Sequence, residues 1–377
     1  MKTLGLIAGL GLILGIWWDA FETVILPRRV TRRFRISRTF YRTSWIPFSA
    51  FLRKMSAGKR RETLLGYYGP LSLLMLLSIW ATALIFGFAL LHWSVGTKLN
   101  APQESVQFTT YAYLSGVTFF TLGFGDLVPL EPLGRVLAVL ECGTGFGFLA
   151  IIIGYLPVIY QAFSRREATI SLLDARAGSP PTALELLRRH SEDGGMDELK
   201  QVLKDLERWS AELLESHLSY VVLCFYRSQH TNQSWIAALA AILDATALVI
   251  VGLDGAPLRQ ARLTFAMARH AVVDLAQIFS TAPKPMEEDR LPGPALAELR
   301  SRLGEVGLRL REGDDATAHL TALRAKYEPY LNALGYYLLM DLPPWMTRAE
   351  KADNWQVSAW DRGKPGSMLT DRDPRHF

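Results

Sequence analysis

The sequence predicts an all-α membrane protein with a helical domain in water at its C-terminal end. Three apolar segments lie before residue 164, and each is long enough to cross a bilayer core, which takes about 20 residues. The rest of the 377-residue chain alternates apolar and charged positions, as soluble helices do. A basic stretch between the first two apolar segments indicates their orientation.

Composition excludes several classes of protein. The two cysteines, Cys142 and Cys224, are far apart, so a disulfide framework is not expected. The chain has no Cys/His metal spacing, no Walker loop and no G-x-G-x-x-G motif. The net charge of +5 is modest. We therefore expect no enzyme activity, no catalytic residue, no organic cofactor and no nucleic-acid partner.

The first apolar segment runs from Leu4 to about Leu26, within a predicted N-terminal domain of residues 1–27. A signal peptide is the alternative, but Trp17-Trp18-Asp19 stands where a small-x-small cleavage site would be needed. We expect an uncleaved extra transmembrane helix.

Two acidic residues, Asp19 and Glu22, lie one helical turn apart near the end of this segment. Carboxylates at membrane depth are costly and often functional. The expected interpretation is that they pair with Arg28, Arg29 or Arg32 near the interface.

Residues 28–66 form a basic segment, which carries no acid between Arg28 and Arg61. Interspersed aromatic residues favour an amphipathic helix on the inner leaflet. Its basic residues then face anionic lipids, and the residues predicted to do so are Arg28, Arg29, Arg32 and Arg33. A voltage-sensor helix is the alternative, because arginines recur at every third position from residue 29 to residue 38. Only one span precedes this run, which argues against it.

The second and third apolar segments run from Tyr68 to Trp93 and from Leu133 to about Phe163. Short loops rich in Lys and Arg favour the cytoplasmic side, so residues 28–61 and Arg165-Arg166 are expected inside. The N-terminus and the loop 94–132 are then outside, and everything after residue 164 is cytosolic. This predicts a multi-pass protein of the plasma or inner membrane.

The loop between these segments contains Thr121-Leu-Gly-Phe-Gly-Asp126. Gly123 and Gly125 reach positive φ at little cost, which lets the backbone alternate between two conformations. Such alternation aims successive carbonyls to one side, where they replace the hydration shell of a cation. An ordinary turn between two apolar helices is the alternative.

Placed between two apolar segments, the motif resembles the selectivity filter of potassium channels with a two-helix pore, usually written T-V-G-Y-G-D. It is also similar to filters of two-pore-domain channels. The resemblance covers about residues 68–163 and implies a pore domain, residues 67–164, of outer helix, pore helix (Val106–Phe120), filter and inner helix. It implies a homotetramer, since one chain supplies one filter strand. It also implies permeant K⁺ ions bound along the filter residues Thr121, Leu122, Gly123, Phe124 and Gly125, with the ions at residues 121 to 124.

Several positions depart from the family pattern. Phe124 replaces the usual tyrosine, and Val117 replaces a glutamate that often pairs with the filter aspartate. We therefore expect the Asp126 carboxylate to accept hydrogen bonds from water or from a backbone amide. Leu122 and Phe124 are expected to pack behind the strand. Glu141 is expected to face the back of the filter or the pore helix. Asp126, Val117 and Glu141 are the predicted filter supports.

The third apolar segment is predicted to form the inner helix. Gly145, Gly147, Gly154 and Pro157 weaken its rigidity and are the predicted gating hinge. The resemblance places Gly145 at the family's hinge glycine. Close helix packing through small residues is an equally good interpretation.

Residues 165–350 are predicted to form a helical cytosolic regulatory domain, followed by a polar tail, residues 351–377. Met196–Tyr226 has the spacing of an amphipathic helix. Ser234–Leu253 is nearly all apolar, but Asp244 at its centre favours a buried bundle helix over a fourth span. The polar segment Arg227–Trp235 is expected to cap helices, and binding of an unidentified cytosolic ligand is the alternative.

Taken together, the sequence predicts a tetrameric potassium-selective channel pore with an extra N-terminal transmembrane helix and an α-helical cytosolic domain that modulates opening. Three alternatives remain: a weakly selective cation channel, a non-conducting membrane receptor with a degenerate pore, and a potassium transporter subunit. The last has four filter-like loops in one chain, whereas this chain has one.

Overall fold

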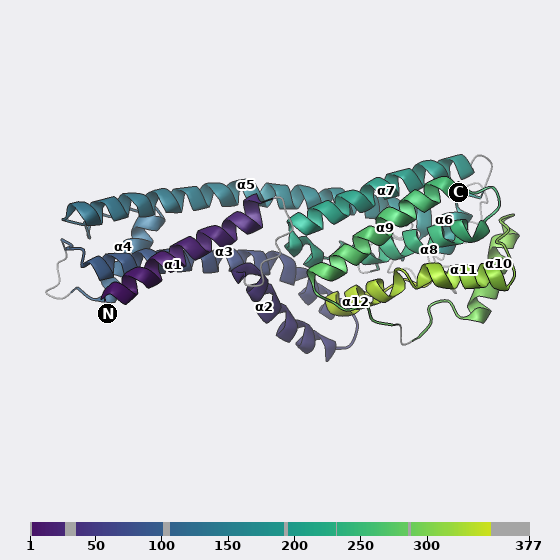
Figure 1. Ribbon diagram of the computed structural model, residues 1–377, viewed down its shortest axis with the longest axis horizontal. Coiled ribbons are helices and arrows are strands. Elements are labelled where there is room, and N and C mark those ends of the chain that lie inside the picture. Colours follow the sequence, from purple (N-terminus) through teal and green to yellow (C-terminus); the bar gives the residue numbers. More distant parts are fainter. Residues whose placement is uncertain are drawn as a thin grey trace, which may run out of the picture. The chain divides into compact units, whose positions relative to one another are not determined.

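The computed structural model describes residues 2–26, 35–100, 106–191, 195–230, 232–285 and 288–347. These residues are almost entirely helical, and their only extended pairings are two isolated bridges, Leu99 with Pro129 and Leu253 with Leu310 (Figure 1). The all-α prediction is confirmed. The chain divides into two compact units, Met1–Gln161 and Ala162–Phe377.

The first unit contains the apolar helices. They are α1 (Lys2–Ala20), a short π-helix η1 (Phe21–Ile25), α2 (Ile36–Arg53), α3 (Lys59–Val95), α4 (Phe108–Phe119) and the first part of α5 (Pro132–Ala177). The predicted interfacial segment is therefore split, because its last residues belong to α3 rather than to a surface helix. Residues 28–34 lie outside the described residues, and with them the predicted lipid contacts of Arg28, Arg29, Arg32 and Arg33.

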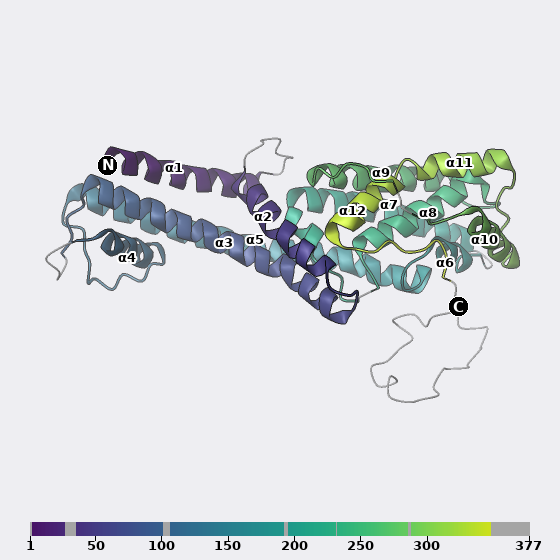
Figure 2. The same ribbon diagram turned by 90° about the horizontal axis from the view of Figure 1, so that it is seen from below.

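The helices α1 and α3 lie side by side (Figure 2). Glycines let their backbones approach: a Cβ on Gly9 would lie 2.8 Å from the carbonyl oxygen of Gly87. A Cβ on Gly5 would lie 2.4 Å from Ser94 Oγ. Small residues spaced four apart are a common way to pack apolar helices closely. The extra helix is thus an integral part of the first unit.

We expect Gly9→Ala to lower the melting temperature of the purified protein. The added methyl meets backbone, and overpacking of this kind costs typically about 1–3 kcal/mol. Gly11→Ala is the matched control on the same helix, because nothing lies within 4 Å of a Cβ there. Equal melting temperatures for the two variants would show that the α1–α3 contact is not tight.

A polar network joins the end of α1 to the start of α2. Asp19 is fully buried and accepts hydrogen bonds from the Ser37 amide (3.0 Å), Ser37 Oγ (3.2 Å) and Trp80 Nε1 (3.1 Å). Glu22 pairs with Arg35 at 3.5 Å. The predicted partners Arg28, Arg29 and Arg32 lie outside the described residues. Among those described, Asp19 is held by a helix amide, a hydroxyl and an indole. The carboxylate satisfies an otherwise unbonded amide in the first turn of α2.

The amphipathic helix α2 packs against α3 through one tyrosine. Tyr68 Oη lies 2.9 Å from Ser44 Oγ, and its ring contacts Trp45 edge-on at 4.7 Å and stacks on Phe48 at 5.1 Å. Ile46 and Phe51 remain exposed on the same helix. An apolar face left open beside basic residues is typical of an interfacial helix.

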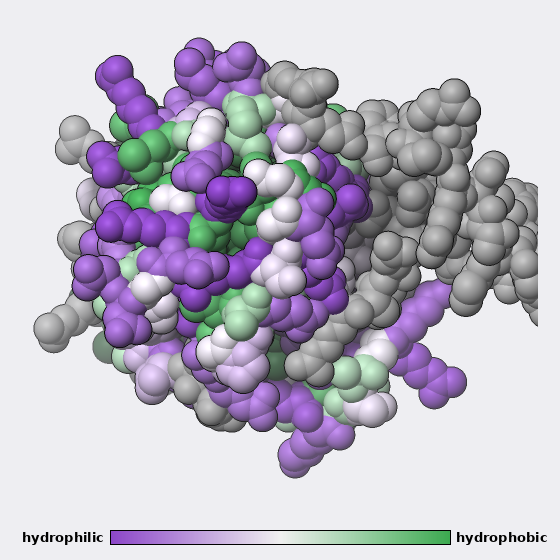
Figure 3. Space-filling model, turned by 90° about the vertical axis from the view of Figure 1, so that its right-hand side faces the viewer, coloured by the Kyte–Doolittle hydropathy of each residue, from purple (hydrophilic) through white to green (hydrophobic). Residues whose placement is uncertain are grey.

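The second unit is a helical bundle built around one buried helix. Its elements after α5 are α6 (Ala183–Arg188), α7 (Gly195–Ser219), the 3₁₀ turn η2 (Val221–Phe225), α8 (Trp235–Gly252), α9 (Leu258–Ile278), α10 (Gly293–Glu305), α11 (Asp314–Arg324) and α12 (Glu328–Leu338). Contacts from α6, α9, α11 and α12 surround α8. The face of this unit seen in Figure 3 is covered mainly by hydrophilic side chains.

Within the described parts of the chain, four helices are long and apolar enough to cross a membrane: Lys2–Ile25, Lys59–Val95, Pro132–Ala177 and Trp235–Gly252. In the last of these, α8, 89% of the residues are buried, compared with 17% in the most apolar stretch of α5. Its central Asp244 is paired inside the unit with Arg290 and Tyr327. These contacts favour the predicted bundle helix, because a lipid-facing helix would not be enclosed by its own chain.

Candidate functional site

The predicted filter begins at the C-terminal end of α4. The Thr121 amide donates to the Thr118 carbonyl (3.0 Å), and the Leu122 amide donates to the Val117 carbonyl (2.9 Å). This pair of bonds is a Schellman motif, which ends a helix with one left-handed residue. Thr121 occupies that position with φ 57°. Val117 thus contacts the filter segment through its backbone carbonyl.

The backbone after α4 alternates in the sign of φ. Thr121, Gly123 and Gly125 have φ values of 57°, 58° and 78°. Positive φ was predicted for the two glycines, whereas at Thr121 it is a finding of the structure. A β-branched residue in this region is a genuine outlier, and such strain collects at functional sites.

The side chains of the filter segment do not pack within their own chain. Leu122 is 55% exposed and Phe124 is 67% exposed. The expectation that they pack behind the strand is therefore wrong for a single chain. An exposed apolar pair beside a strained loop indicates a surface that other atoms cover.

Asp126 has a partner that the sequence analysis missed. Tyr113 Oη donates to Asp126 Oδ2 at 3.0 Å. The expectation that water or an amide would hold this carboxylate is corrected: a side chain of α4, two turns before the end of the helix, holds it instead. The signal was a tyrosine eight residues before Thr121, on the predicted pore helix.

The loops on either side of the filter segment are pinned to each other. The Asn100 amide donates to the Val128 carbonyl (3.0 Å), and the Leu130 amide donates to the Lys98 carbonyl (2.9 Å). Leu99, between them, is buried in a cluster with Ala89, Tyr111 and Leu114. These bonds tie the exit of the filter segment to the end of α3.

Gly145 on α5 packs directly against the end of α4. A Cβ there would lie 1.9 Å from the Phe119 carbonyl oxygen. Close approach of two backbones explains this glycine, in agreement with the packing interpretation. The hinge role of Gly145 remains a prediction.

The other hinge candidates lie within an unbroken helix, since α5 runs from Pro132 to Ala177 through Pro157. A Cβ on Gly147 would lie 3.9 Å from Trp17, whereas one on Gly154 would meet nothing within 4 Å. Packing therefore does not explain why positions 147 and 154 are glycine.

Glu141 lies behind α4, as expected. It is fully buried, and its Oε2 atom is 3.7 Å from Nε2 of His92 on α3. His92 Nδ1 in turn lies 3.0 Å from Thr97 Oγ1. The sequence pointed to Glu141 but not to its partner, because nothing in the apolar run before His92 indicates which helix the imidazole faces.

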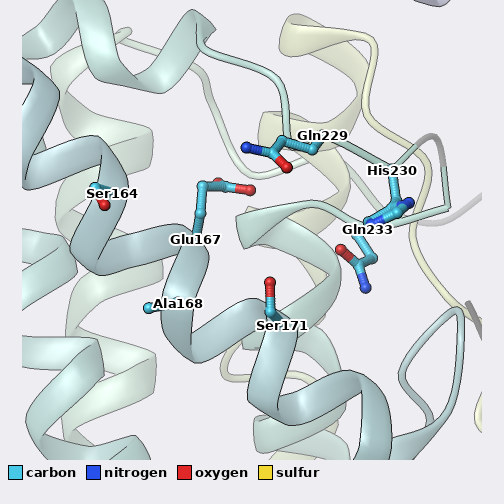
Figure 4. Close-up of a pocket in the computed structure, with 7 residues that line it drawn as sticks. All are labelled: Ser164, Glu167, Ala168, Ser171, Gln229, His230 and Gln233. Carbon is cyan, nitrogen blue, oxygen red and sulfur yellow. The ribbon is translucent and has the colours of Figure 1, made fainter. Parts of the chain in front are cut away.

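The polar segment Arg227–Trp235 lies beside the second unit's part of α5. Most of its polar groups have structural partners: Arg227 Nη2 donates to the carbonyls of Leu338 (2.7 Å) and Leu339 (2.9 Å), and Ser234 Oγ accepts the Ala237 amide (3.0 Å). This agrees with helix capping. A cavity of about 220 Å³ remains between this segment and α5 (Figure 4); its lining includes Glu167, Gln229 and Gln233.

Residues 74–161, from the middle of α3 into α5, match a protein family described as "Ion channel". This part of the chain is therefore an ion-channel domain. The chain is also similar to the uncharacterized membrane protein YdjJ of Bacillus subtilis (strain 168), with 23% identity over 250 residues, 66% of this chain and 72% of that protein. No solved structure gives a significant match. The family match and the membrane relative support an ion channel rather than an enzyme.

Proposed function

We propose that this protein is a potassium-selective channel in which four copies of the chain surround one pore. The observation that carries the proposal is the alternation of φ at Thr121, Gly123 and Gly125, directly after a helix end, within an ion-channel domain. Alternating backbone of this kind turns successive carbonyls toward one side, where they can coordinate a dehydrated K⁺ ion. The carbonyls of residues 121 to 124 would hold the ions.

Several features of the structure support this role. One chain carries one such segment, so a closed ring of carbonyls needs further copies. The exposed side chains of Leu122 and Phe124 would then be covered by neighbouring copies. The Tyr113–Asp126 hydrogen bond and the Val117 carbonyl would hold the segment in place, as filter supports.

The same proposal assigns roles to the rest of the chain. The N-terminus would be extracellular and the second unit cytosolic, in the plasma or inner membrane, with Arg28, Arg29, Arg32 and Arg33 near anionic lipids. The inner helix would open around Gly145, Gly147, Gly154 or Pro157. The second unit would modulate opening, and the cavity beside Glu167 would admit a cytosolic ligand.

The test is the reversal potential of the purified protein in planar bilayers under a K⁺/Na⁺ gradient. We expect reversal near the K⁺ equilibrium potential, and we expect Gly123→Ala to abolish this current. A Cβ at φ 58° costs about 1–2 kcal/mol and disturbs the carbonyl alternation.

Gly307→Ala is the matched control, because it imposes similar strain at φ 76°, outside the ion-channel domain, with nothing within 4 Å of the new methyl. This variant should keep the current. Reversal near zero would indicate a weakly selective cation channel, and absence of current from a folded tetramer would favour a non-conducting receptor.

A further inference from the structure

A buried polar cluster lies behind α4 in the ion-channel domain. We call it the rear cluster; its members are His92 of α3, Thr97 of the following loop, Ser115 of α4 and Glu141 of α5. Each side chain belongs to a residue that is at most 2% exposed. Ionisable groups that are fully buried among apolar helices are costly and are commonly functional.

The rear cluster joins every element around the predicted filter. His92 Nδ1 lies 3.0 Å from Thr97 Oγ1, and the carbonyl of Thr97 accepts a hydrogen bond from Tyr111 Oη of α4 at 2.9 Å. His92 Nε2 lies 3.7 Å from Glu141 Oε2. A chain of three polar contacts therefore links the outer helix, the loop, the pore helix and the inner helix.

The rear cluster lies one helical turn before the point where α5 packs against the end of α4. Glu141 precedes Gly145 by four residues, and Ser115 precedes Phe119 by four. Gly145 packs against the Phe119 backbone, two residues before Thr121. A change in the spacing of α4 and α5 at Glu141 is thus transmitted to the helix end that begins the filter.

The hydrogen-bonding capacity of the cluster is only partly used. Four buried atoms have no hydrogen-bond partner among the described residues: His92 Nε2, Ser115 Oγ, Glu141 Oε1 and Glu141 Oε2. An isolated buried carboxylate is strongly unfavourable, and so is an isolated imidazolium. One proton held between Glu141 and His92 leaves the pair with no net charge, whichever residue carries it.

We propose that His92 and Glu141 share a single proton and act as positioning residues that hold α4 against α5 behind the filter. The proposal rests on the proposed channel function. A second proton gives the pair a net positive charge in an apolar site next to the filter. The extra charge loosens the α4–α5 contact and opposes a cation in the filter, so conduction falls on acidification.

The other titratable groups near this site, apart from Cys142, have their own partners. Tyr111 bonds to Thr97, and Tyr113 bonds to Asp126. Lys98 and Glu131 pair with each other at 2.9 Å on the exposed loops. Arg135 donates to the Pro129 carbonyl at 3.2 Å, and Cys142, half-buried on α5, is a free thiol.

The test compares K⁺ currents of full-length wild type, His92→Gln, Glu141→Gln and the double variant in planar bilayers across acidic to neutral pH. Wild type should lose current in one step on acidification. Both single variants should lose this step or shift its midpoint by about one pH unit or more, a tenfold change in proton affinity. His319→Gln, at an exposed histidine in the second unit, is the control and should keep the wild-type profile.

Melting temperatures of the same purified proteins provide a readout that does not depend on conduction. The two single substitutions should not be additive: the double variant, in which neither group ionises, should melt above the value expected from their sum. Additive melting temperatures with unchanged pH profiles would overturn the proposal. If no protein carries current, the channel function fails by itself, while coupling in the melting temperatures still decides whether the pair shares a proton.

Discussion

Replacing Gly145 with alanine is expected to destabilise the ion-channel domain severely and to remove any current it carries. The added Cβ would lie 1.9 Å from the carbonyl oxygen, 2.8 Å from the carbonyl carbon and 3.0 Å from the Cα of Phe119. All three are backbone atoms, so no rotamer change relieves the overlap. Either α4 or α5 must move, and α4 carries the predicted filter at its end. Overpacking costs typically about 1–3 kcal/mol, and a backbone clash belongs at or above the upper end.

The measurement is the melting temperature and the bilayer current of the purified variant, with Gly143→Ala as control. Gly143 lies half a turn earlier on α5, and nothing lies within 4 Å of a Cβ there. A hinge without close packing predicts a different result: Gly145→Ala would then alter opening but leave the melting temperature unchanged. Full stability together with normal current would contradict both interpretations of this glycine.

Replacing Asp244 with alanine is expected to destabilise the second unit by about 3–5 kcal/mol. Asp244 is fully buried in α8, where it accepts hydrogen bonds from Arg290 and from Tyr327 Oη, the latter at 2.6 Å. Removing the carboxylate leaves a buried guanidinium with only Glu328, at 3.3 Å, as its remaining acidic partner. It also leaves the Tyr327 hydroxyl without its acceptor.

The pH dependence of the same site gives a second readout. Burial raises the pKa of Asp244 to about 6, although Arg290 opposes the shift. Because this folded-state pKa lies above the ordinary value of 3.8, the folded protein binds a proton at Asp244 more tightly than the unfolded chain does. The contribution of Asp244 to stability is therefore greatest below pH 3.8 and is lost as the pH rises towards 6. Asp244→Asn should remove this part of the pH dependence.

Thermal unfolding of full-length protein, followed by helical circular dichroism between about pH 4 and pH 7, tests both expectations. The exposed Asp254 at the end of α8 supplies the control, since Asp254→Ala should change the free energy of unfolding by at most about 0.5 kcal/mol. Similar melting temperatures for Asp244→Ala and Asp254→Ala would mean that the buried network contributes little to stability.

The sequence predicted the helices better than their ends. Hydropathy located α1, α3 and α5, because burial in lipid requires long apolar runs, but α5 continues well past the apolar residues to Ala177. The basic segment was predicted as one surface helix. In the structure its last residues extend α3, since helical propensity continues across charged residues that hydropathy treats as a boundary.

The backbone conformation of the filter motif could be predicted from the sequence because it depends on the residue types themselves. Two glycines at alternate positions favour alternating φ whatever surrounds them, and Gly123 and Gly125 have the expected sign. The left-handed conformation of Thr121 could not be read in the same way. It comes from the Schellman bonds that end α4, and nothing in the residue type favours it.

The sequence by itself determined the membrane segments, the motif at residues 121–126 and the helical second unit, because hydropathy, periodicity and glycine placement act over short stretches of chain. Only the tertiary structure decided the partners: Tyr113 for Asp126, His92 for Glu141, the Phe119 backbone for Gly145, and Ser37 with Trp80 for Asp19. Each of these contacts depends on how two segments cross in space. Burial then determines how much each contact contributes to stability. Inside the fold a charge has no water to solvate it, and an added methyl group has no free space to fill.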